Sequence, residues 1–177
     1  MSSPVLKKVP FTPDLLPKLV TFSCGTEEWQ AEVSDWLKLP PGEGGAADEV
    51  ADGGRVWLYY NENGEVVGVG SLGVTLQRHP GTGVENTPAS VIPYVGLDTK
   101  FQGKGYSTPI LRDLLAEAMA DAEQRPIVVL QVHYGNQAAE RLYRDKYGFT
   151  DISDYQPDPQ TGRIYKWMGL ALTPAGV

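Results

Sequence analysis

The stretch Gln102-Gly103-Lys104-Gly105-Tyr106-Ser107 stands between a strand predicted to end near Asp98 and a helix predicted to begin near Ser107. Glycine allows the backbone to turn successive N–H groups toward one point. The helix that follows adds the positive end of its dipole. The stretch therefore predicts a cradle for an anion such as a pyrophosphate. A plain turn between strand and helix, with a solvated Lys104, is the alternative.

Two other glycine patterns lie in the wrong context for a nucleotide site. Residues 68–73 match Gly-x-Gly-x-x-Gly, but the match lies inside a predicted strand and no helix follows it. The dinucleotide motif needs a strand before it and a helix after it. The pair Gly103-Lys104 also does not match the phosphate loop of NTPases. That loop needs a glycine where this chain has Asp98, and a serine or threonine where it has Gly105.

Outward from this stretch, hydrophobic periodicity predicts alternating strands and helices. The predicted strands are residues 55–60, 65–76, 91–97, 127–132 and 164–172, and a turn at 61–64 makes the first two a hairpin. The predicted helices are residues 12–22, 26–39, 107–125 and 136–147, with loops at 77–90 and at the acidic, flexible stretch 42–54. Pro93 is expected to leave its strand bulged or splayed, because proline has no N–H for the ladder.

The strand predicted at residues 127–132 is apolar throughout and follows a strand and a helix. That pattern is typical of a buried parallel strand reached by a right-handed crossover. Together with the hairpin, it predicts an α/β fold with a mixed sheet in one layer.

Composition fits one globular domain and disfavours several classes of protein. The chain has 177 residues, of which 41% are hydrophobic and 21% charged. Its single cysteine, Cys24, excludes an intramolecular disulfide, and two isolated histidines do not predict a zinc cluster. No apolar run approaches the ~20 residues of a membrane span, and no secretory signal is recognised, so a cytoplasmic protein is expected. The net charge of −7 disfavours a nucleic-acid partner.

Two segments of the chain carry a family pattern. Gln102, Gly105 and Ser107 fill the key positions of (Arg/Gln)-x-x-Gly-x-(Gly/Ala), with Ser107 in place of the usual small residue. Residues 136–143, followed by Gly-Phe at 148–149, fill Asn-x-x-Ala-x-x-Leu-Tyr…Gly-Phe. In this order, one helix and one strand apart, they resemble motifs A and B of the GNAT superfamily of N-acetyltransferases.

The resemblance implies a single domain over residues 1–177, with a splayed parallel strand pair flanked by helices and a CoA-binding core at about 91–150. It implies acetyl-CoA as cosubstrate, with its pyrophosphate on the N–H groups of residues 102–107 and its pantetheine amides beside the backbone of Leu97 and Thr99. Asn136 would bind a pantetheine carbonyl or cap its helix. The residues assigned to CoA are Leu97, Thr99, Gln102, Gly103, Lys104, Gly105, Tyr106, Ser107 and Asn136.

The resemblance also assigns the chemistry. Tyr143 falls on the position that, in the superfamily, donates a proton to the departing sulfur, and a phenol with a pKa near ~10 keeps its proton at neutral pH. Aromatic packing at helical spacing is the alternative for Tyr143. The oxyanion donor would be a backbone N–H near Leu97 or Asp98. The candidate bases are Asp98, His133 and Glu85, and a water chain without a dedicated base is the remaining option.

The acceptor expected from the resemblance is a primary amine of a small molecule, peptide or protein, which attacks directly in a ternary complex. Two alternatives stay open. Residues 22–25, Phe-Ser-Cys-Gly, with Trp36-Leu37, are similar to a segment of some GNAT proteins, among them toxins that acetylate aminoacyl-tRNA, although Glu28-Trp29 replaces the usual Leu-Asp pair. The chain could instead bind acyl-CoA as a sensor without turnover. Many relatives dimerise, so a homodimer stays open, but nothing in the sequence marks an interface.

Overall fold

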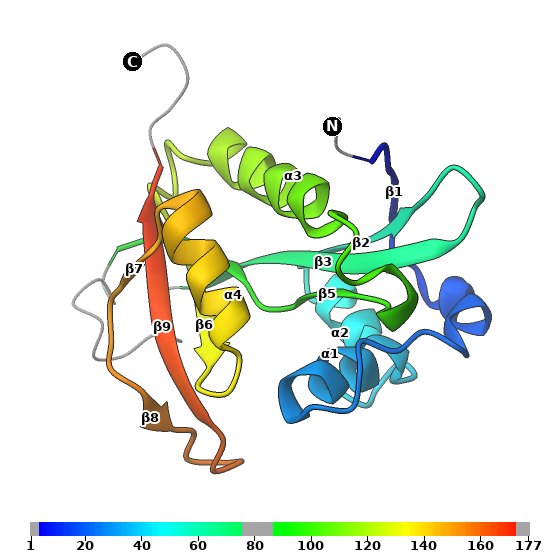
Figure 1. Ribbon diagram of the computed structural model, residues 1–177, viewed down its shortest axis with the longest axis horizontal. Coiled ribbons are helices and arrows are strands. Elements are labelled where there is room, and N and C mark those ends of the chain that lie inside the picture. Colours follow the sequence, from blue (N-terminus) through cyan, green and yellow to red (C-terminus); the bar gives the residue numbers. More distant parts are fainter. Residues whose placement is uncertain (1–3, 76–86, 173–177) are drawn as a thin grey trace. The chain divides into compact units, whose positions relative to one another are not determined.

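The structure, a computed structural model, describes residues 4–75 and 87–172 (Figure 1). The described residues gather into two compact units. The first unit comprises Met1–Gly73 with Tyr94–Ala116, and the second comprises Val74–Pro93 with Glu117–Val177. Within the described ranges, no helix is long and apolar enough to cross a membrane.

The strands of the first unit form an antiparallel set in the order β1-β2-β3-β5. They are β1 (Lys7–Pro10), β2 (Arg55–Tyr60), β3 (Val66–Thr75) and β5 (Val95–Leu97). The predicted hairpin is confirmed up to residue 75, and Asn61 Oδ1 closes its turn by accepting the N–H groups of Asn63 and Glu65. Strand β1 was not predicted from the sequence.

The glycines at positions 68 and 70 of β3 serve close packing. A Cβ added at Gly68 would lie 2.6 Å from the Gly96 carbonyl oxygen and 2.9 Å from Ile110 Cδ1. At Gly70 it would lie 3.0 Å from Leu114 Cδ1. The side chains of helix α3 (Ser107–Ala120) therefore press against the strand at its glycines.

The N-terminal helices are partly as predicted. Helix α1 (Glu28–Lys38) is confirmed, and its buried face includes Val33, Trp36 and Leu37. The helix predicted at residues 12–22 is instead a shorter 3-10 helix, η1 (Pro13–Leu19). Pro17 lies inside this segment and has no N–H to donate to an α-helical ladder, which explains the tighter, shorter turn.

The stretch at residues 42–54 was predicted to be a flexible loop, and this prediction is wrong. It contains helix α2 (Ala46–Ala51), in which Ala46 and Ala47 are buried. The Asp48 carboxylate accepts the N–H groups of Gly42 at 2.8 Å and Gly44 at 2.6 Å, and these bonds lower its pKa. The acidic residue thus organises the glycine-rich backbone before the helix.

The second unit contains the parallel pair of the mixed sheet. Strand β4 (Ala89–Ile92) runs parallel to β6 (Ile127–His133), and β6 pairs antiparallel with β9 (Ile164–Ala171). Two short strands, β7 (Thr150–Asp151) and β8 (Gln156–Pro157), also pair with β9. The predicted mixed α/β sheet is confirmed.

Pro93 divides the strand predicted at residues 91–97 into two. Its first part belongs to β4, which pairs with β6, and its second part is β5, which pairs with β3. A proline has no N–H for a ladder and fixes its own φ, so the chain changes partner at this point. The prediction of one continuous strand is therefore wrong, although Pro93 was expected to disturb it.

The helix predicted at residues 136–147 is present in two forms. Helix α4 (Gln137–Arg141) continues directly into one π-helical turn, η3 (Leu142–Lys146). Gly148, with φ +79°, ends the segment before β7. The sequence predicted the helix but not the π turn.

Candidate functional site

The glycine stretch of the first unit forms a turn between the 3-10 helix η2 (Thr99–Phe101) and α3. Gly103 has φ +74° and Gly105 has φ +85°, so both occupy the left-handed region that glycine favours. A Cβ added at either glycine would meet no atom within 4 Å. Glycine is therefore required by the backbone conformation, and the space beside the turn is open.

Helix α3 begins at Ser107, immediately after this turn. The first N–H groups of a helix have no partner inside the helix, and the dipole places partial positive charge there. Lys104 is exposed beside them. This combination suits a phosphate group.

Gln102 holds the start of the turn in place. Its Nε2 donates to the Cys24 carbonyl at 2.8 Å and to the Leu97 carbonyl at 3.0 Å. The ring of Tyr106 packs edge-on against Phe101, with centroids 5.5 Å apart. The predicted CoA residues Gln102 and Tyr106 thus have structural contacts of their own.

Asp98 is buried, and both of its carboxylate oxygens accept backbone N–H groups. Ser23 donates to Oδ2 at 3.2 Å and Lys100 donates to Oδ1 at 2.9 Å. Next to it, the Thr99 N–H donates to the Ser23 carbonyl at 2.8 Å. This geometry makes Asp98 an anchor of the backbone before the turn, and it leaves the Thr99 N–H engaged inside the protein.

The single cysteine lies in the same segment. Cys24 is buried, and burial raises the pKa of its thiol to about 11. Because the thiolate is the nucleophile, a thiol with this pKa is unreactive at neutral pH. Cys24 is therefore unsuited to act as a nucleophile at neutral pH.

Tyr143 lies in the π turn of the second unit. Its side chain is buried, and burial, followed by the neighbouring Tyr147, raises the pKa of the phenol to about 12. Its ring lies 5.8 Å from that of Phe149, whose N–H donates to the Tyr143 carbonyl at 3.0 Å. The phenol is thus fully protonated at neutral pH, and single π turns occur often at functional sites.

Asn136 caps helix α4. Its Oδ1 accepts the Ala139 N–H at 3.3 Å, so the structure contains the cap that the sequence left as one of two roles. A cap uses only the carbonyl oxygen of the amide. The Nδ2 group is the donor that a pantetheine carbonyl would need.

His133 lies at the end of β6 and is buried. Its Nδ1 accepts the Gly135 N–H at 3.0 Å, and its ring meets Tyr165 edge-on at 5.3 Å. An accepting Nδ1 places the proton of the neutral imidazole on Nε2. In this arrangement His133 is a hydrogen-bond donor through Nε2. Glu85, the third candidate base, lies outside the described residues.

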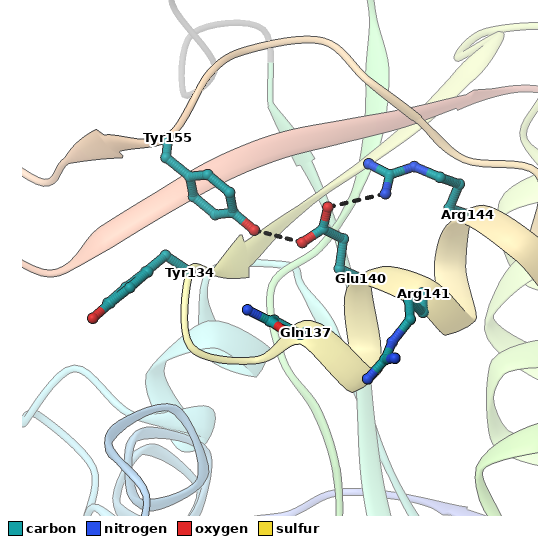
Figure 2. A pocket seen from close by; sticks show the side chains of 6 residues that line it. All are labelled: Tyr134, Gln137, Glu140, Arg141, Arg144 and Tyr155. Carbon is teal, nitrogen blue, oxygen red and sulfur yellow. Dashed lines mark hydrogen bonds and ion pairs between the residues drawn. The ribbon is translucent and has the colours of Figure 1, made fainter.

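A pocket of about 360 Å³ opens beside α4, on the face shown in Figure 2. Its lining residues are Tyr134, Gln137, Glu140, Arg141, Arg144 and Tyr155. The Glu140 carboxylate is its obvious chemical group, but it is fully engaged. Tyr155 donates to Oε2 at 2.6 Å, and Lys166 and Arg144 contact Oε1.

These partners, Lys166 first, lower the pKa of Glu140 to about 2. Such a carboxylate is a poor proton acceptor at neutral pH. Sequence reasoning did not single out Glu140, although its spacing to Arg144 is that of a helical ion pair. Among the described residues, no cluster of histidine, cysteine, aspartate or glutamate could hold a metal ion.

The model of the acetyltransferase (GNAT) family matches residues 22–149. The chain belongs to this family. The match includes both segments whose motifs indicated the family, and it also includes α1, α2 and the hairpin. A search of curated proteins found no match.

Solved structures share the GNAT fold at low sequence identity. A bacterial toxin is 17% identical with a TM-score of 0.70, covering 96% of this chain and 92% of its own. AtaTR bound with AcCoA is 15% identical with a TM-score of 0.63, covering 90% and 91%. The spermidine/spermine N-acetyltransferase SpeG from Vibrio cholerae is 14% identical with a TM-score of 0.60, covering 94% and 92%.

Within the GNAT chain, the predicted site residues fall into two groups. The first unit brings Leu97, Asp98, Thr99 and Gln102 together with the backbone of Ser23 and Cys24. The second unit holds His133, Asn136 and Tyr143 on β6, α4 and η3. Sequence reasoning missed the role of residues 22–25 as the support of the glycine turn.

Proposed function

We propose that this GNAT protein transfers an acetyl group from acetyl-CoA to a primary amine of a small molecule, peptide or protein, by direct attack in a ternary complex. The observation that carries the proposal is the turn at residues 102–106, with its two left-handed glycines, its open space and the start of α3 behind it. The unreactive Cys24 supports direct transfer, because a covalent route through that thiol is disfavoured.

Acetyl-CoA supplies an activated thioester. In this proposal the N–H groups of residues 103–107 bind its pyrophosphate, because the Gln102 N–H already donates to the Thr99 carbonyl, and Lys104 adds a positive charge beside them. The Leu97 carbonyl has a second lone pair that can accept a pantetheine N–H beside the bond from Gln102. Asn136 donates through Nδ2 while its Oδ1 caps α4.

Tyr143 is proposed to donate a hydrogen bond, and then its proton, to the sulfur as the thiolate leaves. A phenol with a pKa of about 12 is a weak acid toward a free thiolate, whose pKa is near ~8.5. The same loss of solvent that raises the pKa of Tyr143 also raises the proton affinity of a thiolate beside it. The hydrogen bond from Tyr143 to the sulfur therefore becomes stronger as negative charge develops on the sulfur in the transition state.

The amine is proposed to lose its proton to water. Asp98 is buried and each of its carboxylate oxygens already accepts one backbone N–H, and His133 Nδ1 already accepts the Gly135 N–H, so neither is favoured as the base. Direct attack then requires the small free-amine fraction or a chain of waters. The likeness in fold to SpeG, a spermidine/spermine N-acetyltransferase, supports an amine as acceptor class, and the net charge of −7 favours a cationic one.

The first test is ligand binding by thermal unfolding with acetyl-CoA, CoA, ATP and NAD. At ~100 times Kd a specific ligand adds about 2.7 kcal/mol of stability, which raises Tm by several degrees. Both CoA species should raise Tm, and ATP and NAD should not. No shift with either CoA species would overturn the assignment of the glycine turn.

The second test is an acceptor panel read by mass spectrometry of the acetylated product. It contains a polyamine, a lysine-containing peptide, a peptide with a free N-terminus and aminoacyl-tRNA. Acetylation of one of the first three is expected. Acetylation of aminoacyl-tRNA alone would favour the toxin alternative, and tight CoA binding without any product would favour a sensor.

A further inference from the structure

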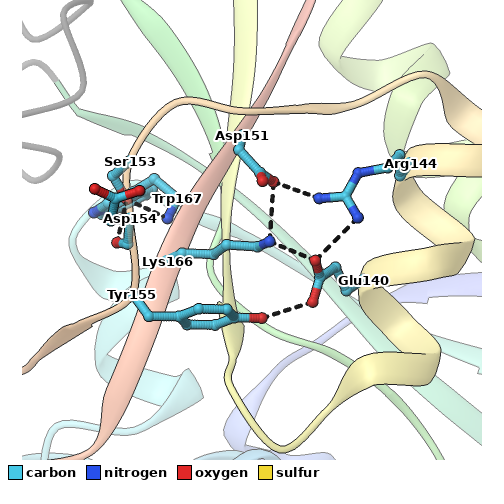
Figure 3. A network of polar contacts seen from close by, with 8 residues as sticks. All are labelled: Glu140, Arg144, Asp151, Ser153, Asp154, Tyr155, Lys166 and Trp167. Atoms are coloured by element: carbon cyan, nitrogen blue, oxygen red, sulfur yellow. Dashed lines mark hydrogen bonds and ion pairs between the residues drawn. The ribbon is translucent and has the colours of Figure 1, made fainter.

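Four charged side chains close a ring in the second unit (Figure 3). Lys166 on β9 contacts the carboxylates of both Glu140 and Asp151, the latter at 3.0 Å. Arg144 contacts the same two carboxylates, Glu140 at 3.0 Å and Asp151 at 2.7 Å. The Tyr155 hydroxyl adds a bond to Glu140. Only 5% of the Lys166 side chain is exposed, so its charge depends on these partners.

The charged residues of this ring lie on both sides of Tyr143 in the sequence. Glu140 lies three residues before Tyr143 and Arg144 lies directly after it. Asp151 follows Phe149, whose ring packs on Tyr143 and whose N–H donates to the Tyr143 carbonyl. The Lys166 ammonium group therefore contacts α4 through Glu140 and β7 through Asp151. Arg144, in the π turn, contacts the same two carboxylates.

The turn that carries Tyr143 needs such support. It is π-helical, a form that is rare and usually limited to one turn. A π turn changes the direction of the side chains that follow, relative to an α-helix. Relaxation of Leu142–Lys146 to an α-helix would rotate Tyr143, so whatever holds both ends of the turn sets the direction of the phenol.

We propose that Lys166 is a positioning residue for Tyr143. Through Glu140, Arg144 and Asp151 it holds the π turn, and thereby the phenol, in the orientation in which the proton reaches the leaving sulfur. The proposal rests on the role proposed for Tyr143 above. A purely structural role would not require the ion pairs to converge on the turn that carries the acid, and a buried ion pair is weak evidence for stability alone.

The test is a double-mutant cycle of Lys166→Met with Tyr143→Phe, read as kcat with an accepted amine. Lys166→Met should lower kcat roughly ten-fold or more while the Kd of CoA stays within about two-fold. In the Tyr143→Phe background the same change should lower kcat less than about two-fold, because the group it positions is gone. Equal losses in both backgrounds would overturn the proposal.

Lys8→Met is the control for loss of a similar lysine–aspartate–tyrosine cluster in the first unit, at a more exposed lysine. Lys8 in the first unit pairs with Asp113 at 3.0 Å, and the Tyr59 hydroxyl donates to Asp113 at 2.7 Å, so the chemistry resembles that of Lys166, Glu140 and Tyr155. This variant should leave kcat unchanged. A comparable loss of kcat in Lys8→Met would mean that lost stability, rather than positioning, explains the effect.

A second readout does not depend on turnover. Tyrosine labelled with ¹³C at Cζ gives one signal per residue, and the Tyr143→Phe spectrum identifies that of Tyr143. Lys166→Met, and the milder Asp151→Asn at a half-exposed position, should move this signal, and Lys8→Met should not. An unmoved Tyr143 signal in both ring variants would overturn the proposal. Full activity of Tyr143→Phe would overturn the role of Tyr143 instead, while this readout still decides whether Lys166 orients the side chain.

Discussion

At the scale of single residues, the site is defined by which atoms are already bonded. Asp98 and His133 were both reasonable bases by their places at strand ends, yet backbone N–H groups engage their accepting atoms. Tyr143 differs, because its burial keeps the proton on the oxygen. The protein thus carries a well-protected donor and, among the described candidates, acceptors that have other partners.

The pH dependence of transfer follows from this arrangement. With water as acceptor, kcat/KM should rise about ten-fold per pH unit from about 6 to 9 for an acceptor amine with a pKa near ~10.4. Initial rates across this range measure the slope. A plateau within this range that disappears in His133→Gln would instead assign the base to His133.

Stability in acid should depend on Glu140. Its pKa in the folded protein is about 2, below its ordinary value of 4.5. The stabilisation is therefore fully present above about pH 4.5 and is lost as pH falls through 2. The Tm of the natural protein should exceed that of Glu140→Gln at neutral pH, and the two should converge toward pH 2. Glu62→Gln, at an exposed position, controls for loss of a surface carboxylate.

At the scale of elements, the glycine turn and the start of α3 act together. The turn brings the chain to Ser107 in the conformation that two left-handed glycines allow. No atom crowds either position, so a substitution there tests conformation without steric overlap. A loss of CoA binding after such a substitution can then be attributed to the backbone conformation of the turn.

Gly105→Ala should weaken CoA binding by roughly five- to thirty-fold, because a left-handed alanine costs about 1–2 kcal/mol. Calorimetric titration with CoA measures the change. Gly64→Ala is the matched control, since Gly64 has φ +76° and equally open surroundings in the hairpin turn. It should lower Tm to a similar extent and leave the Kd of CoA unchanged. A Kd that Gly105→Ala does not alter would contradict the assignment of the turn.

The sequence predicted the elements whose signals are local and periodic. The hairpin, α1, β6 and the start of α3 follow from alternation, helical spacing and turn residues. Helix α2 was missed because it is short and its buried face consists mainly of two alanines, which leave no periodic signal in a glycine-rich stretch. The π turn was missed because it depends on partners on β7 and β9.

At the scale of the whole molecule, the chain builds its two units from interleaved segments. The chain leaves the first unit after Gly73, returns to it at Tyr94 and leaves it again after Ala116. This last boundary lies inside helix α3. The net charge of −7 belongs to this whole chain. Charge acts on encounter with the acceptor rather than on the fold.

Ionic strength should therefore separate acceptor classes. Raising it from about 0.01 M to about 0.1 M shortens the Debye length from about 30 Å to about 10 Å. The kcat/KM for a triamine should fall more steeply than that for a monoamine of similar length, because the triamine is attracted more strongly. Equal slopes would contradict electrostatic attraction of the acceptor. An acceptor such as aminoacyl-tRNA should show the opposite dependence, as a polyanion repelled at low salt.

The buried thiol of Cys24 has a practical consequence for work on this protein. Because it is the single cysteine of the chain and its pKa is raised to about 11, disulfide reagents should leave the folded protein unmodified. A colorimetric thiol reagent can then count released CoA directly, without subtraction of a protein signal. A cysteine introduced on the surface could carry a fluorophore without replacement of the native residue.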